Sequence, residues 1–377
     1  MNLPARYGIV SYNRYGSFTN YGSALQAWAL KTAVDRLGSG RWKAVLMDYC
    51  PDILLERDIL NPMKDMWDKD AEARRLCEMT LPAIRVNYEK FQTFFATRFE
   101  NTSRRYTSAD FNRCVTQENL DGFICGSDTI FCVNEFGFDD GFFANYPCMQ
   151  NGRSVAYAAS FGDVKLAEKD KPRLNELLRN FRAIALRESA MAPYVRAQTA
   201  APVDRVIDPT LLLAPADYEP ITAPRQEEGD YLLLYARRYN PAMEAYAEAL
   251  ARKNGWKIVE ISLRAENAAR HRMFYEAGVE EFLSLVKHAA YVVTNSYHGT
   301  IFSIQFSTPF SLFSREQCDG KIAELLSLLG LTDQLLITGQ EAASAPIFYP
   351  AVHAAAKAER ERSLSILQTY LYSLWES

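Results

Sequence analysis

Short apolar runs alternate with helix-patterned stretches along most of this 377-residue chain, and that pattern limits the possible folds more than any other feature. Residues 7–12 (YGIVSY) have the pattern of a buried strand. Residues 24–38 have that of a helix that ends at a glycine, and residues 43–49 that of the next strand. A strand, a helix and a second strand in succession are typical of a parallel α/β sheet.

The alternation runs in two series. Residues 52–118 are rich in charge, methionine and aromatic side chains and have helical patterning, so we expect a helical insertion over the first sheet. Residues 214–230 carry three prolines and no periodicity, which is typical of a linker. The further strands expected are 121–126, 154–160, 183–187 and 205–209 in the first series, and 231–236, 257–262, 291–296 and 309–313 in the second.

Two domains are expected, because a chain this long exceeds the usual size of a single core. We place an N-terminal Rossmann-like domain at residues 1–215, with its helical insertion, and a C-terminal one at residues 216–377, ending in a long amphipathic helix. The fold class is therefore α/β, with two doubly wound domains that face a cleft. Ligands of such sheets bind at the carboxyl ends of the strands.

Composition excludes several classes of function. The net charge of −4, from 42 basic and 46 acidic residues, lacks the basic excess of a nucleic-acid-binding protein. No apolar run approaches the ~18 residues of a membrane span, and the first residues lack a signal-peptide pattern. The seven cysteines are scattered, without a CxxC pair. We expect a cytoplasmic protein with reduced thiols, no nucleic-acid partner and at most peripheral membrane contact.

Polar residues follow several of the expected strands. Asn20, Gly22 and Ser23 stand at a helix start, where the sequence predicts either an ordinary helix cap or a glycine whose neighbouring N–H groups attract an anion. Ser127 and Asp128 directly follow the strand at 121–126. Their alternatives are a tight turn with a capping aspartate, or a carboxylate that faces the cleft.

Two further strand ends carry charge. Arg187 and Glu188 end the strand at 183–187, where an arginine suits recognition of a carboxylate or phosphate and the alternative is a local ion pair. Asp208 precedes Pro209 at another strand end. An Asp-Pro pair before a turn is usually structural, and we interpret Asp208 in that way.

The stretch 292–310 (VVTNSYHGTIFSIQFSTPF) places His298 where a buried strand gives way to a helix. Asn295, Ser296, Gly299 and Thr300 surround it with polar or small residues. Because imidazole titrates nearest neutral pH, this histidine is the candidate general acid or base. The chain has three more histidines, His271, His288 and His353, and their dispersal gives no metal-ligand spacing.

Taken together, these motifs resemble the polysaccharide pyruvyl transferase family. The resemblance covers roughly residues 7–332 and depends on the order of motifs that are individually unspecific. They are NYGSALQAWAL (20–30), FICGSDTIF (123–131), YAASFG (157–162), ALRE (185–188), IDPTLLL (207–213), the stretch 280–310 and, more weakly, GKIAELLSLLGL (320–331).

The resemblance implies a GT-B-type fold and transfer of the pyruvyl unit of phosphoenolpyruvate onto two hydroxyls of a saccharide, forming a pyruvate ketal in surface-polysaccharide biosynthesis. It implies that His298 is the histidine at the donor site and that Arg187 binds the donor. We expect no metal and no cofactor beyond this donor. The acceptor is a saccharide, which includes the lipid-linked glycans found at the inner face of the membrane.

One position departs from the family. Some members have an arginine two residues before the histidine, where this chain has Ser296, so one donor-binding charge is missing. Arg237, Arg238 and Arg315 are candidates to replace it. Two other functions fit the same pattern: a GT-B glycosyltransferase that uses a nucleotide sugar, and a non-catalytic glycan-binding protein.

Overall fold

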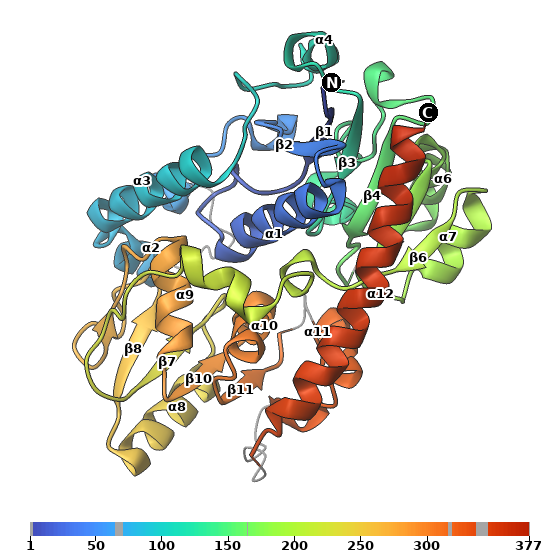
Figure 1. Cartoon of the computed structure of the whole chain (residues 1–377). Coiled ribbons are helices and arrows are strands. Elements are labelled where there is room, and N and C mark those ends of the chain that lie inside the picture. The colour runs from blue at the N-terminus through green and yellow to red at the C-terminus, as the bar shows by residue number, and fades with distance from the viewer. Residues whose placement is uncertain (1–2, 65–70, 164, 316–318, 337–345, 377) are drawn as a thin grey trace.

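A computed structural model describes residues 3–64, 71–163, 165–315, 319–336 and 346–376. Two six-stranded parallel sheets, each covered by helices, form an N-terminal and a C-terminal lobe (Figure 1). This arrangement of two Rossmann-like lobes confirms the expected GT-B-like α/β fold. All ten of the expected strands are present, and the structure adds two strands of two residues each at the edges of the second sheet.

In the first sheet the strand order is β2-β1-β3-β4-β5-β6. The strand order changes direction between β1 and β3: β2 is added on one side of β1, and β3 to β6 are added on the other. The carboxyl ends of β1 and β3 therefore flank the crevice of this sheet. The elements of this lobe are β1 (Ala5–Val10), α1 (Tyr21–Gly38), β2 (Trp42–Leu46), α2 (Ala71–Glu78), α3 (Leu81–Arg98), α4 (Cys114–Glu118), β3 (Gly122–Cys125), α5 (Val133–Phe136), β4 (Ser154–Ala159), α6 (Lys171–Leu177), β5 (Ala183–Leu186), α7 (Ala192–Gln198) and β6 (Val203–Arg205).

In the second sheet the order is β12-β11-β10-β7-β8-β9, the order of the dinucleotide-binding fold, with its reversal between β7 and β10. The edge strands β9 and β12 are too short to leave a periodic pattern in the sequence. The elements are β7 (Tyr231–Tyr235), α8 (Pro241–Asn254), β8 (Lys257–Ile261), β9 (Arg272–Met273), α9 (Val279–Lys287), β10 (Tyr291–Thr294), α10 (Tyr297–Gln305), β11 (Phe310–Phe313), α11 (Asp319–Leu328), β12 (Leu335–Leu336) and α12 (Tyr349–Trp375).

The helical insertion is present and lies against the second lobe. Helix α3 reaches α9, where the Asn87 amide donates to the carbonyl of Ala277 at 2.5 Å and Arg98 pairs with Glu280 at 2.7 Å. In Figure 1, α2 and α3 lie beside the C-terminal lobe. The insertion therefore contributes to the contact between the two lobes as well as covering the first sheet.

Aromatic side chains fill much of the contact between the lobes. The ring of Tyr21, at the start of α1, stacks on Phe282 of α9 with centroids 4.6 Å apart. Tyr218, fully buried in the connection between the sheets, packs against Trp28 of α1 and Phe302 of α10. Because this packing is shared by both lobes, α1 and α10 are held side by side, and their N-terminal ends meet.

Candidate functional site

The carboxyl ends of the central strands of both sheets converge at the N-terminal ends of α1 and α10. Asn20 caps α1: its side-chain oxygen accepts from the N–H groups of Gly22 at 3.1 Å and Ser23 at 3.3 Å. Of the two alternatives that the sequence left open, the structure shows the helix cap, which uses both N–H groups. The role of Gly22 is steric.

Gly22 lies directly against His298. A Cβ atom at position 22 would stand 1.9 Å from the Nδ1 atom of the imidazole, a distance that no side chain can adopt. Only glycine allows the first turn of α1 to approach the histidine of α10 so closely. The sequence predicted both residues as site residues, and the structure brings them into contact.

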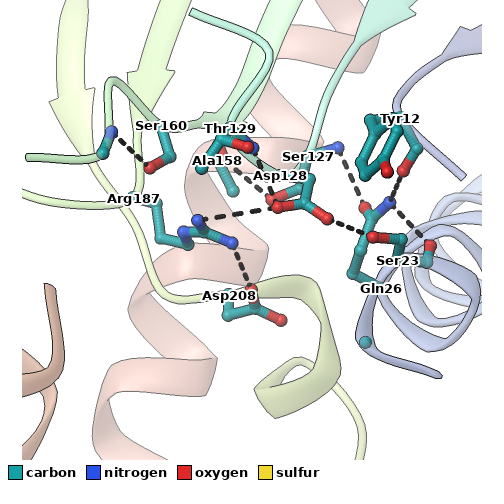
Figure 2. A network of polar contacts seen from close by, with 12 residues as sticks. Tyr12, Ser23, Gln26, Ser127, Asp128, Thr129, Ala158, Ser160, Arg187 and Asp208 are labelled. Atoms are coloured by element: carbon teal, nitrogen blue, oxygen red, sulfur yellow. Dashed lines mark hydrogen bonds and ion pairs between the residues drawn. The ribbon is translucent and has the colours of Figure 1, made fainter. Parts of the chain in front are cut away.

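The loop after β3 supports α1. Asp128 accepts a hydrogen bond from the Ser23 hydroxyl at 2.6 Å and from the N–H of Thr129 at 2.9 Å (Figure 2). Ser127 is fully buried: its N–H donates to Gln26 at 3.0 Å and its hydroxyl to the carbonyl of Ala158 at 2.7 Å. Ser127 therefore holds the loop in place through these two hydrogen bonds, and its binding of substrate stays a prediction.

Arg187, at the end of β5, lies between two carboxylates, as Figure 2 shows. Its Nη1 atom is 3.0 Å from Asp208 Oδ2, and its Nη2 atom is 4.0 Å from Asp128 Oδ1. The guanidinium stacks on the Tyr297 ring, 5.0 Å from its centroid, and the side chain is only 1% exposed. Burial alone would lower the pKa of Arg187, but Tyr297 and the carboxylates raise it well above its ordinary value. The group stays charged.

Asp208 connects Arg187 to His298. Its Oδ2 atom, which contacts Arg187, also lies 3.4 Å from His298 Nε2. Its Oδ1 atom accepts from the N–H and the hydroxyl of Thr210 at 2.9 and 2.6 Å. Burial opposes ionisation, but His298 and Arg187 hold the pKa of this carboxyl well below its ordinary range. Asp208 also caps a turn, as the sequence suggested, yet its second oxygen makes it part of the site.

The residues around His298 fix the start of α10. Ser296 caps the helix by accepting from the Gly299 N–H at 3.2 Å, and the Thr300 hydroxyl donates to the Ser296 carbonyl at 3.0 Å. Asn295 is 1% exposed; it accepts from the N–H of Arg237 at 2.7 Å and donates to a neighbouring carbonyl. These contacts are internal, so Asn295, Ser296, Gly299 and Thr300 position His298, and their binding of a ligand stays a prediction.

The structure adds two charged groups that sequence interpretation missed as site residues. Glu188 is buried beside Arg187, accepts from the N–H of Phe161 at 2.7 Å, and has its pKa raised by burial. The ammonium of Lys321 lies 5.5 Å from the centroid of the Tyr297 ring, on whose surface Arg187 also stacks. Lys321 is the second residue of the weak motif at 320–331, and its nearness to Arg187 depends on how the two lobes pack.

None of the three arginines proposed to replace the missing family arginine lines the cavity beside Arg187, Tyr297 and Lys321. The guanidinium of Arg237 covers the Phe18 ring at 4.6 Å and lines a separate pocket, while the carbonyl of Arg238 accepts from Asn295. The N–H of Arg315 donates to Asp319 at 2.7 Å. Among the cations of the described residues, Lys321 is the one that shares the Tyr297 ring with Arg187.

Within the described ranges, no three histidine, cysteine, aspartate or glutamate residues are grouped in a way that could hold a metal ion. Likewise, none of the described helices combines the length and the apolar character that a membrane crossing requires.

These features define a class of protein: a two-lobed fold of the GT-B type, with a buried arginine and a histidine 3.4 Å from a carboxylate where the lobes meet. A family model described as polysaccharide pyruvyl transferase matches residues 20–317. The chain belongs to the polysaccharide pyruvyl transferase family.

Solved structures agree on the fold. UDP-N-acetylglucosamine 2-epimerase from Neisseria meningitidis, bound to UDP-GlcNAc, has 7% identity and a TM-score of 0.51 over 98% of this chain and 99% of that one. A putative UDP-N-acetylglucosamine 2-epimerase from Listeria monocytogenes has 9% identity and a TM-score of 0.51 over 97% and 91%. No curated protein sequence matches the chain.

Proposed function

We propose that this protein transfers the pyruvyl unit of phosphoenolpyruvate to two hydroxyls of a saccharide, releasing phosphate and forming a pyruvate ketal of a surface polysaccharide. The observation that carries the proposal is the contact of one Asp208 oxygen with both Arg187 and His298 in a chain of this family. A histidine held by a carboxylate beside a buried guanidinium suits a donor that is both an anion and a proton acceptor.

His298 is the proposed general acid. Because Nε2 faces Asp208, the nitrogen left to exchange a proton with a ligand is Nδ1, on the side of Gly22. Protonation of the methylene carbon of phosphoenolpyruvate creates a cationic carbon next to it. The first sugar hydroxyl attacks that carbon, the carbon–oxygen bond to phosphate breaks, and the second hydroxyl closes the ketal. One hydroxyl proton balances the proton given to the donor, and the other leaves with phosphate.

Arg187 and Lys321 are the proposed partners of the donor's negative charges. The Nε and Nη2 atoms of Arg187 are buried, and no described residue accepts a hydrogen bond from them. Buried donors of this kind are costly to leave unpaired, which favours a ligand that accepts from them. Lys321 takes the place of the family arginine that Ser296 has replaced.

Binding of the donor requires a change in this structure. The cavity between Arg187, Tyr297 and Lys321 measures ≈ 10 Å³, which is at most the room needed by one water molecule. Phosphoenolpyruvate does not fit there until the wall formed by α11 moves. We therefore interpret the structure as a closed form, from which the two lobes separate to admit the donor.

Two measurements test the proposed function. Phosphoenolpyruvate, and not uridine diphosphate, is expected to raise the melting temperature, because a ligand that binds the folded state stabilises it. Mass spectrometry of glycan acceptors incubated with enzyme and phosphoenolpyruvate is expected to find the mass of one pyruvate less water. His298→Ala abolishes this product while changing the melting temperature by only a few degrees; His353→Ala, a histidine remote from the site, serves as the control.

The opposite ligand preference would contradict the proposal. Stabilisation by uridine diphosphate alone would favour a glycosyltransferase that uses a nucleotide sugar, and stabilisation by neither would favour a non-catalytic glycan-binding protein. Unfolding of the His298→Ala variant would mean that this histidine is structural.

A further inference from the structure

A second and larger pocket lies between the lobes, outside the cluster of Arg187, Asp208 and His298. It measures ≈ 100 Å³ and opens at the carboxyl ends of β7 and β8. By the same measure one water needs about 10–15 Å³, so the pocket has room for several water molecules. Five aromatic residues from both lobes line it: Phe18, Tyr21, Tyr235, Tyr239 and Tyr275.

The aromatic side chains that line this pocket differ in exposure: Tyr21 and Tyr235 are buried, whereas Phe18 and Tyr275 are half-buried. Tyr239 is 45% exposed, which is unusual for a large side chain beside a pocket. The guanidinium of Arg237, 4.6 Å above the Phe18 ring, fixes the facing wall. Flat rings of this kind remove the C–H face of a sugar ring from water without demanding a particular hydroxyl pattern.

The polar lining of the pocket mixes acceptors with donors. Glu260 and Glu266 contribute carboxylates, and Arg237 and Arg264 contribute guanidinium groups. The hydroxyl of Tyr275 is buried and has no hydrogen-bond partner within the described part of the chain. A hydroxyl-rich ring can donate to the carboxylates and accept from the arginines and Tyr275, so it satisfies both kinds of group.

A diphosphate fits this lining less well. The two carboxylates of the wall offset its two guanidinium groups, so the lining offers a dense anion no excess of positive charge. The turn after β7 reads ARRYN (236–240) and contains no glycine, whereas phosphate-binding turns of this fold use glycine to let the backbone approach the phosphates. The pocket therefore favours a neutral sugar ring over the diphosphate of a nucleotide sugar.

The pocket adjoins the residues that hold His298. Tyr21 of its wall precedes Gly22, which contacts the imidazole. The ring of Tyr235 comes within 3.1 Å of the position that a Cβ atom would take on Gly299, the residue after His298. Asn295 accepts from the N–H of Arg237, and this hydrogen bond links the pocket wall to the start of α10.

From this geometry we infer that the pocket between Tyr239, Tyr275 and Phe18 binds one uncharged pyranose ring of the saccharide acceptor. That the bound sugar is the acceptor of a reaction rests on the proposed pyruvyl transfer. Binding of the sugar itself requires neither the donor nor turnover. The pocket orients the ring against Tyr239 and presents its hydroxyls toward the start of α10.

Saturation-transfer NMR with methyl pyranosides of glucose, galactose, mannose and N-acetylglucosamine, in the absence of phosphoenolpyruvate, tests the pocket. We expect transfer to at least one glycoside. Tyr239→Ala is expected to weaken its binding roughly five- to tenfold through the lost ring contact. Tyr275→Phe is expected to weaken binding without lowering the melting temperature, because it deletes a hydroxyl that has no hydrogen-bond partner among the described residues. Phe348→Ala, at an exposed aromatic far from the pocket in sequence, is the control.

Each outcome is decisive. Absence of transfer to every glycoside, or equal transfer in wild type and both pocket variants, overturns the inference. Transfer to uridine diphosphate that is lost in Tyr239→Ala also overturns it, since the pocket would then take a nucleotide. Failure of the proposed function is distinguishable: phosphoenolpyruvate would then fail to stabilise the wild type, while glycoside binding would remain and would depend on Tyr239.

Discussion

At the scale of single residues, Asp208 illustrates what a sequence can and cannot predict. Its position before Pro209 correctly predicted a turn, and Oδ1 does accept from the Thr210 N–H. The other oxygen contacts Arg187 and His298, 21 positions before and 90 positions after it. A strand-end aspartate can cap and bind at once, and only the packing of three separate segments reveals the second role.

Asp208→Asn is expected to lower the rate of ketal formation by roughly 10²–10⁴-fold, because His298 loses the carboxylate that orients its ring. Steady-state rates across a pH series measure the effect. The expected signature of a positioning residue is a changed pH profile with little change in the KM for phosphoenolpyruvate. Asp217→Asn, which removes a carboxylate paired with Arg36, is the matched control and should leave the profile unchanged. An unchanged profile in Asp208→Asn would remove Asp208 from the mechanism.

Asp208 also links stability to pH. Its folded-state pKa lies below the ordinary value of about 4, so its ionised form stabilises the folded protein above that value. This contribution is lost as the pH falls below about 4 toward the folded-state pKa. Thermal melts should therefore show Asp208→Asn well below wild type at neutral pH, by about 3–5 kcal/mol for a broken buried pair, and closer to it in acid. A difference that does not depend on pH would contradict this account.

At the scale of elements, the sequence predicted which strand ends carry polar residues but not how those residues divide between capping and chemistry. Arg187 and Asp128 do meet, because the parallel strands of the first sheet bring their carboxyl ends to one edge. His298 belongs to the second lobe and reaches Asp208 through the packing of the two lobes. Ser127 and Asn295 instead bond to neighbouring segments, Ser127 to Gln26 of α1 and Asn295 to the turn after β7, although the same pattern had marked them as ligand-binding. In the sequence, a polar residue that stabilises a loop cannot be distinguished from one that binds a ligand. Its hydrogen-bond partners in the structure are needed to separate the two roles.

The approach of α1 to α10 gives a prediction at this scale. Gly22→Ala places a methyl group 1.9 Å from the imidazole Nδ1 atom, so His298 must move away from the first turn of α1. Ketal formation is expected to fall at least as far as in Asp208→Asn, because Nδ1 is the proposed proton donor. Circular dichroism should still report a folded protein. Gly38→Ala, at the far end of the same helix and close to the Trp42 ring, controls for steric strain and should keep its activity. Full activity of Gly22→Ala would place the proton donor elsewhere.

At the scale of the whole molecule, the alternation of strands and helices predicted the two-lobed architecture. The contacts between the lobes could not be predicted from the sequence. The C-terminal helix α12 was expected from its amphipathic pattern and assigned to the second half of the chain. It runs along both lobes (Figure 1). Its Tyr349 donates to the carbonyl of Thr308 in the second lobe, and Tyr370 donates to Asp204 at 2.8 Å in the first. An apolar stripe indicates that a helix packs against the protein, but it does not indicate which surface the helix covers.

The closed form implied by the small cavity beside Arg187 has an identifiable contact. Glu324 of α11 accepts from the N–H and the hydroxyl of Ser189 at 2.8 and 2.9 Å, so it joins the second lobe to the strand end that carries Arg187. Its side chain also lines that cavity. If the lobes must separate before phosphoenolpyruvate enters, this contact opposes entry.

Glu324→Ala is therefore expected to speed association of phosphoenolpyruvate up to about fivefold, the effect of removing a partly exposed contact worth at most about 1 kcal/mol. Stopped-flow binding measures the association rate, and single-turnover assays should show an unchanged chemical step. Glu324 also lies 4.0 Å from Arg205, which forms a second ion pair with Glu359 of α12 at 2.7 Å. Glu359→Ala breaks that second pair and should leave the association rate unchanged. Equal association rates in wild type and Glu324→Ala would mean that the donor reaches Arg187 without separation at α11, and that the cavity opens from another side.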